Sequence, residues 1–155
     1  MARPQEIERL GTQLSHQQWD QRIEAAEALS RLGDPRGIPS LAKELDHRNF
    51  QARQAAAEAL GKIRDPQTVP MLIQVLQDED RWVVKAATEA LSQIGDPRAI
   101  PRLTDLLSNE FPLLRISAAE ALSILKEASG IAALVKELSD YHYDVRLAAV
   151  EALGH

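Results

Sequence analysis

A short segment of the chain recurs at a constant interval. The sequence AAEAL at residues 25–29 returns with small changes four more times, which places a Glu at positions 27, 58, 89, 120 and 151. Each step is 31 residues without an insertion, and five such steps equal the 155 residues of the chain. A fixed period over the whole length indicates a stack of repeated units, in which each unit covers the apolar face of its neighbour.

Each unit predicts two helices, and the first of them is rich in Ala, the best helix former. Larger apolar residues such as Leu60 and Ile63 extend its i, i+3 stripe. A Gly-Asp-Pro corner follows at residues 33–35, where Gly suits a left-handed helix end, Asp can cap the next helix and Pro suits its first turn. The fourth unit has Lys-Glu-Ala at residues 126–128 instead, which predicts a less sharply defined corner.

The second helix of each unit carries apolar residues at spacings of three and four, as in Ile38, Leu41 and Leu45. Pro39 follows the first of these residues, so the helix is expected to begin close to it. The same stripe at the start of the chain predicts a lone helix of the second type. The expected organisation is a single domain over residues 1–155 with about ten helices: a half repeat at 4–15, four helix pairs over 19–142 and a half repeat at 143–155.

The best-preserved units run from Ala52 to Leu76 and from Val83 to Leu107, and they follow the pattern VRxAAxEALGxIGDPRAIPxL. This pattern resembles the HEAT-like repeats that are named after phycobilisome (PBS) lyases, and the resemblance covers essentially the whole chain. It implies an all-α fold, a right-handed α–α superhelix, with the first helices on the convex side and the second helices lining the concave side.

The resemblance also implies a polar ladder between repeats, formed by recurring Arg and Asp residues. Val84 occupies the Arg position of the third unit, so the ladder should break there, and Lys85 can replace the planar guanidinium only in part. The residues expected in the ladder are Arg22, Arg53, Arg115 and Arg146 with Asp34, Asp65 and Asp96.

The composition excludes several classes of function. Eighteen Lys and Arg against 23 Asp and Glu give a net charge of −5, which argues against binding nucleic acid through phosphate neutralisation. The absence of Cys excludes disulfides, thiolate catalysis and cysteine-held metals. No apolar run is long enough to span a membrane and the N-terminus has no signal core, so a cytoplasmic location is expected.

No residue pattern predicts catalysis, a metal or another cofactor. Deoxyhypusine hydroxylases, which are HEAT-like, bind iron through His-Glu pairs early in the first helix, and none of the equivalent pairs here contains His. A DNA glycosylase of this architecture would need a basic concave face with aromatic residues, whereas the concave positions here are mixed in sign. The recurring Glu residues form a row along the stack, which predicts solvation or salt links rather than acid–base chemistry.

Two surfaces are candidates for binding another protein. One is a patch on the concave side with apolar residues at its centre and polar residues around it. The alternative is that Val75 and Leu106 simply pack against the next helix. The candidate residues of this patch are Met71, Gln74, Val75, Arg102, Asp105 and Leu106.

The second surface follows from the six aromatic residues, which all fall within four consecutive positions of the repeat, at the start of the first helix. They are expected to line one edge of the stack. Trp82, Phe111 and Tyr141 are candidate anchors for a partner, because aromatic residues often dominate binding energy. The alternative is a hydrophobic staple at each helix start.

The two ends of the stack are predicted to be open. The last helix carries Val145, Leu147, Val150 and Leu153 with no second-type helix after it, and the first helix has no partner before it. Copies could therefore stack head to tail, unless the chain is a piece of a longer array. The preferred function is a non-catalytic protein–protein interaction scaffold. The alternatives are an accessory subunit of a phycobilin lyase or phycobilisome-handling system, and a fragment or engineered repeat module that assembles head to tail.

Overall fold

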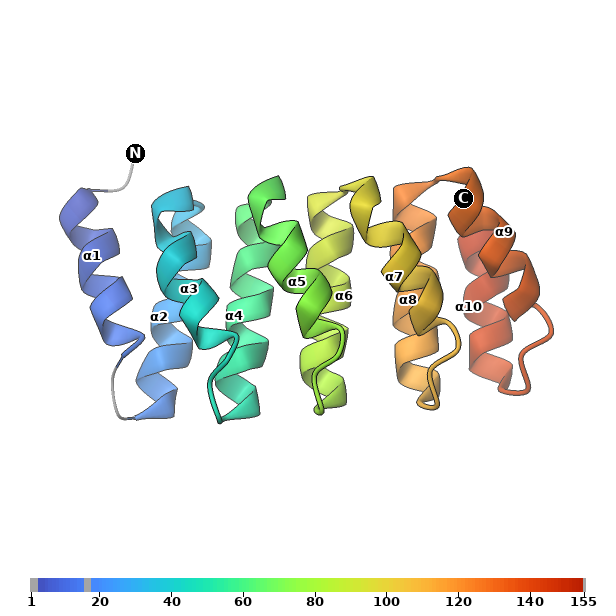
Figure 1. Cartoon of the computed structure of the whole chain (residues 1–155), viewed down its shortest axis with the longest axis horizontal. Coiled ribbons are helices and arrows are strands. Elements are labelled where there is room, and N and C mark those ends of the chain that lie inside the picture. The colour runs from blue at the N-terminus through green and yellow to red at the C-terminus, as the bar shows by residue number, and fades with distance from the viewer. Residues whose placement is uncertain (1–2, 16–17, 155) are drawn as a thin grey trace. The chain divides into compact units, whose positions relative to one another are not determined.

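The computed structural model describes residues 3–15 and 18–154. This part of the chain folds into ten α-helices and three short 3₁₀ turns, and no strand occurs within it (Figure 1). The predicted all-α class is confirmed. The helices form two compact units, residues 1–94 and residues 95–155, so the single domain expected over the whole chain stays a prediction.

The first unit contains six α-helices: α1 (Pro4–Gln13), α2 (Trp19–Leu32), α3 (Ile38–Glu44), α4 (Phe50–Ile63), α5 (Val69–Val75) and α6 (Arg81–Ile94). The long helices α2, α4 and α6 lie side by side, with α4 in the middle (Figure 1). The short helices α3 and α5 pack on α4 and α6, while α1 packs against α2. This is the alternation of first and second helices that the 31-residue period predicts.

The second unit contains α7 (Ile100–Leu106), α8 (Pro112–Leu125), α9 (Ala128–Glu137) and α10 (Tyr143–Leu153). Here α8 and α10 are the long neighbours, and α7 and α9 pack on them from one side. Within the described residues of both units, no helix has the length and apolar character needed to cross a bilayer.

Small residues set the spacing of the long helices. Ala56 and Ala57 on α4 and Ala90 on α6 are all buried. A Cβ atom added to Gly61 would lie 2.6 Å from the Cα atom of Ala90. The Ala-rich first helices therefore gain their stability from close backbone approach as well as from the buried Leu stripe.

The corner between the two helices of a pair is built as the sequence predicts, with one difference. Gly33 and Gly95 end their helices in the left-handed region, with φ of 60° and 76°. Asp34 then accepts a hydrogen bond from the backbone N–H of Arg36 at 3.0 Å. This bond caps a 3₁₀ turn, Pro35–Gly37, and the second helix starts only after it, at Ile38. The equivalent turns are Pro66–Thr68 and Pro97–Ala99.

The sequence predicts a less sharply defined corner in the fourth unit, and this prediction is wrong. Lys126 adopts a left-handed conformation with φ of 52°, so the corner is as sharp as the others. What changes is the segment after it: no 3₁₀ turn forms there, and α9 runs for ten residues where α3, α5 and α7 have seven. The absence of Pro removes the reason for a separate turn, because a backbone N–H is present at every position.

Candidate interaction site

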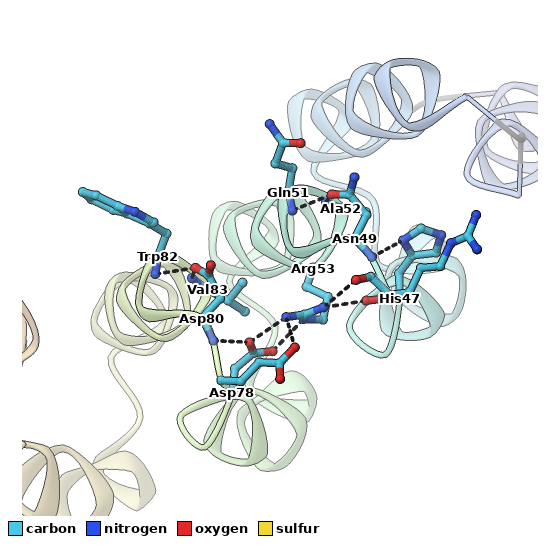
Figure 2. A network of polar contacts seen from close by, with 11 residues as sticks. His47, Asn49, Gln51, Ala52, Arg53, Asp78, Asp80, Trp82 and Val83 are labelled. Carbon is cyan, nitrogen blue, oxygen red and sulfur yellow. Dashed lines mark hydrogen bonds and ion pairs between the residues drawn. The ribbon is translucent and has the colours of Figure 1, made fainter.

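A network of polar contacts in the first unit is centred on Arg53, in the first turn of α4 (Figure 2). Its Nε and Nη2 atoms donate to the two carboxylate oxygens of Asp78 at 2.7 and 2.8 Å. Its Nη1 atom donates to the carbonyl oxygens of His47 and Arg48 at 2.8 and 3.3 Å. The bond to Asp78 raises the pKa of Arg53. The buried guanidinium thus ties α4 to the loop before it and to the loop after α5.

The second unit repeats this arrangement at Arg115. Its Nε and Nη2 atoms donate to Asp140 at 2.8 and 3.0 Å, and Nη1 donates to the carbonyl oxygens of Asn109 and Glu110. Its guanidinium carbon lies 4.7 Å from the centroid of the Tyr141 ring. Burial opposes ionisation of Asp140, but the hydrogen bonds from Arg115 and from a backbone N–H outweigh it and lower the pKa of Asp140.

The arginine ladder therefore exists, but the predicted acidic partners are wrong. Arg53 lies in the first turn of α4, whereas Asp65 follows the last turn of that helix. Twelve residues of helix separate the two by about 18 Å, which a side chain does not span. The aspartates assigned to the ladder instead cap the 3₁₀ turns at the opposite corner: Asp34, Asp65 and Asp96.

Two of these turn-capping aspartates also pair with an arginine two residues ahead. Asp34 accepts from Arg36 at 2.6 Å, which holds the pKa of Asp34 at about 2. Asp96 accepts from Arg98 at 2.7 Å, which lowers the pKa of Asp96. These are exposed, local pairs that fix one corner rather than links between repeats.

The first and last arginines of the ladder have other hydrogen-bond partners. In the first repeat, Arg22 donates from Nε and Nη2 to Glu44, at 2.8 and 2.7 Å. In the last, Arg146 donates to the carbonyl oxygens of Asp140 and Tyr141 at 2.8 and 3.2 Å. Lys85 pairs with Glu89 in its own helix, so it does not stand in for the missing third arginine.

A hydrogen-bond acceptor recurs in the loop that joins the second helix of one repeat to the first helix of the next. The side chain at this position accepts a hydrogen bond from the backbone N–H two residues later, which closes a tight turn. The acceptor is a carboxylate 25 residues after Arg53 and Arg115, and an Asn 25 residues after Val84. That spacing is the sequence signal that distinguishes Asp78 and Asp140 from the aspartates of the Asp-Pro corners. The four acceptors are His47, Asp78, Asn109 and Asp140.

In the first unit, the predicted binding residues Met71, Gln74 and Val75 lie on α5. A groove of about 210 Å³ runs between α3 and α5, lined by these three residues and by Asp46 among others. Gln74 is exposed and Met71 is half-buried, but Val75 is only 8% exposed. Val75 therefore belongs to the packing between helices, the alternative that the sequence left open.

In the second unit, Arg102, Asp105 and Leu106 lie on α7. Arg102 and Asp105 are exposed and form an ion pair with each other at 3.1 Å. Leu106 is 6% exposed, so it too is a packing residue. The expected apolar centre of Met71, Val75 and Leu106 is thus corrected for Val75 and Leu106, because helix packing already covers both side chains, whereas Met71 is half-buried.

The three aromatic residues predicted as anchors are exposed. Trp82 is 44% and Tyr141 76% exposed, and Phe111 is exposed as well. In the first unit, Trp19, Phe50 and Trp82 stand in the first turns of α2, α4 and α6. A staple that buries the ring against its own helix does not account for this exposure.

Rigid helix starts hold two of these aromatic residues. The carboxylate of Asp80 accepts from the backbone N–H groups of Trp82 and Val83, at 2.8 and 3.4 Å, while the indole points away from the network (Figure 2). Asn49 caps α4 in the same way, directly before Phe50. The backbone beneath both rings is therefore fixed by hydrogen bonds, and the rings themselves are presented to solvent.

The recurring Glu residues take part in short-range contacts. Glu27 pairs with Arg31, Glu58 accepts from Gln54, and Glu120 and Glu151 are exposed. Among residues 3–15 and 18–154, no three His, Asp or Glu side chains come together in a way that could hold a metal ion.

Comparisons with solved structures place this fold among repeat solenoids. A chain of the CpcE–CpcF complex of phycocyanin lyase from Nostoc sp. PCC7120 is 23% identical, with a TM-score of 0.79 over 94% of this chain and 96% of that one. YibA of Escherichia coli is 22% identical, with a TM-score of 0.76 over 98% of this chain and 60% of that one. A designed armadillo repeat protein in complex with the peptide (KR)4 is 20% identical, with a TM-score of 0.63 over 93% and 80% of the two chains.

Family models agree with these structures, although no curated protein matches the chain. The model of the PBS lyase HEAT-like repeat matches residues 21–47. The model of HEAT repeats matches residues 38–123 and 101–155, which together are well over half of the sequence. The chain therefore belongs to the HEAT repeat proteins and contains a repeat of the PBS lyase HEAT-like class.

Proposed function

We propose that this chain is a non-catalytic scaffold that binds another protein through the aromatic residues at its helix starts and through the second-type helices. The observation that carries the proposal is the exposure of Trp19, Phe50 and Trp82, each of which is the first or second residue of one of three adjacent helices. Large aromatic side chains that remain exposed on a rigid frame are unusual without a partner, since their burial contributes strongly to binding.

The frame beneath these rings favours binding rather than turnover. The helix starts are capped by Asn49 and Asp80, and the buried Arg53 network holds the loops between them. A preorganised backbone reduces the entropy lost when a partner docks. The polar groups of the same region are engaged in holding the loops, which supports a structural role for them.

Each unit also offers side chains on its own second-type helices. Gln74 and Met71 border the groove between α3 and α5 in the first unit. Arg102 and Asp105 are exposed on α7 in the second. Polar and charged side chains of this kind form the rim of an interface, where they set orientation more than affinity.

The test compares capture of partners by the wild-type chain and by a variant with Trp19, Phe50 and Trp82 replaced by Ser, using proximity cross-linking in the source cell. The matched control is Ile124→Ser, which removes another exposed apolar side chain. We expect the triple variant to lose the specific partner while the control retains it, with circular dichroism showing both folded. Equal capture by all three proteins contradicts the proposal.

The second candidate is an accessory role in bilin attachment or phycobilisome handling. The match to the CpcE–CpcF complex favours it, because it covers nearly all of both chains. The experiment incubates the chain with a bilin and an apo-phycobiliprotein, with and without a cognate lyase subunit, and follows the visible absorbance. A chain-dependent gain of covalently bound bilin supports this role, whereas a general scaffold leaves the absorbance unchanged.

A further inference from the structure

The last two helices present an apolar surface to solvent, which we call the C-terminal face. Its five side chains are each between 39% and 57% exposed. Beside them, a small hollow is lined by Ile131, Leu134 and Leu153 among others. The C-terminal face consists of Ile131, Val135 and Leu138 on α9 and Leu147 and Val150 on α10.

Three of these five positions are buried one repeat earlier in the same unit. Ile100 corresponds to Ile131, Leu107 to Leu138 and Ala119 to Val150, since each pair is 31 residues apart. All three of the earlier residues are buried. The helices that follow them in the unit, α9 and α10, pack on α7 and α8. The C-terminal face therefore has the apolar composition of a surface that packs between repeats, and neither α9 nor α10 covers it.

The opposite end of the chain has a different chemistry. In the first unit, a hollow beside α1 and α2 is lined by Gln13, Gln21, Glu24 and Arg31, with Leu10 and two Ala residues beneath. Inner first-type helices carry apolar residues where α2 has Gln21: Ala52 and Val83 in the same unit, both buried. In repeat proteins, an outer face with polar side chains at such positions is stable in contact with water. The first repeat therefore carries polar side chains at a position where the inner repeats are apolar, whereas the C-terminal face is apolar.

We propose that two copies of this chain associate through their C-terminal faces, tail to tail about a two-fold axis. Head-to-tail stacking, the arrangement suggested by the open ends in the sequence, would set Leu147 and Val150 against Glu24 and Gln21. That arrangement would bury the Glu24 carboxylate against apolar side chains, which cannot form a hydrogen bond or ion pair with it. The C-terminal face placed on itself buries apolar surface alone, and an isologous contact closes after two copies.

The charges around the C-terminal face do not oppose this pairing. Lys126 lines the hollow next to Ile131, and Glu151 is exposed next to Val150. Both signs therefore border the face, so a second copy does not meet a rim of a single sign. An exposed apolar surface with a mixed polar border has the anatomy of a protein interface.

The first test is sedimentation equilibrium over a wide range of concentrations. We expect the average mass to rise from 17.2 kDa to twice that value and to stop there. The double variant Leu147→Asp, Val150→Asp removes two exposed side chains, so it should remain folded by circular dichroism and dimerise roughly 100-fold more weakly. The matched control Glu24→Arg alters the polar hollow beside α1 and α2 and should leave dimerisation unchanged.

The second test uses the absence of Cys from the chain. Val150→Cys and Glu24→Cys variants carry different tags and are treated with a short bismaleimide, separately and mixed. Tail-to-tail pairing predicts that Val150→Cys cross-links to itself, with no mixed product. A mixed product with open-ended growth in mass would establish head-to-tail stacking, and a strict monomer at all concentrations would remove self-association. Either result overturns the proposal, and neither bears on the aromatic surface.

Discussion

Arg53 and Asp78 are joined by two hydrogen bonds, 2.7 Å from Nε and 2.8 Å from Nη2, across 25 residues of sequence. The contact connects the start of one first-type helix to the loop that leads into the next. Arg115 and Asp140 are joined in the same way in the other unit. The recurrence shows that the 31-residue unit repeats its polar connections as well as its apolar stripe.

Replacement of Arg53 by Ala is expected to destabilise the fold by about 3 kcal/mol, because it leaves the largely buried carboxylate of Asp78 without its partner. Lys at this position keeps the charge but not the planar fork, so an intermediate loss is expected. The free energy of unfolding from urea denaturation measures both. Arg36→Ala, which breaks an exposed pair with Asp34, is the control and should cost far less. Equal losses at the two sites would refute a special role for Arg53.

Asp140 is expected to make stability depend on acid pH. Its pKa in the folded state lies below the ordinary value of 3.8, so its contribution is complete above that pH and is lost as the pH falls through the folded pKa. Asp140→Asn should cost about 2 kcal/mol at pH 7, because the charge of buried Arg115 loses its counterpart. Urea denaturation at several pH values should show this difference shrinking below about pH 4. A difference that is independent of pH would contradict the assignment.

Glu137 is expected to make stability depend on pH in the sense opposite to that of Asp140. Burial raises its pKa above the ordinary value of 4.5, and the neighbouring Asp140 adds to the rise. Ionisation of Glu137 therefore costs stability in the folded state as the pH increases through the folded pKa. Glu137→Gln should stabilise the chain at pH 7 by up to about 1 kcal/mol and have no effect under more acidic conditions. Glu151→Gln, at an exposed position, should show neither effect.

Gly61 is expected to tolerate no larger residue. An Ala side chain there would place its Cβ 2.6 Å from the Cα of Ala90, so α4 and α6 would have to move apart. A loss of roughly 1–3 kcal/mol is typical of such overpacking, more than the gain in helix propensity. The matched control is Gly154→Ala, whose nearest contacts would lie at 3.5 Å. Thermal unfolding of the two variants distinguishes close packing from a general effect of replacing Gly.

The local organisation of this protein follows from its sequence alone. The helix pairs, the left-handed ends at Gly33 and Gly95, and the capping role of Asp34 each depend on residues within one or two turns of each other. Periodicity and turn chemistry act at that range, so they could be predicted. The place of the aromatic residues near the helix starts also follows from the repeat, whereas their exposure is seen only in the structure.

Contacts between helices were decided by the tertiary structure. Aspartates recur after both helices of a unit, and recurrence alone does not choose between Asp78 and Asp65 as the partner of Arg53. The choice depends on which end of a helix of 14 residues the arginine occupies. Burial of Val75 and Leu106 likewise depends on how neighbouring helices pack. The contrast between a polar first repeat and an apolar last face emerges only when the solvent exposure of each position is known, because the periodic pattern is nearly the same at both ends.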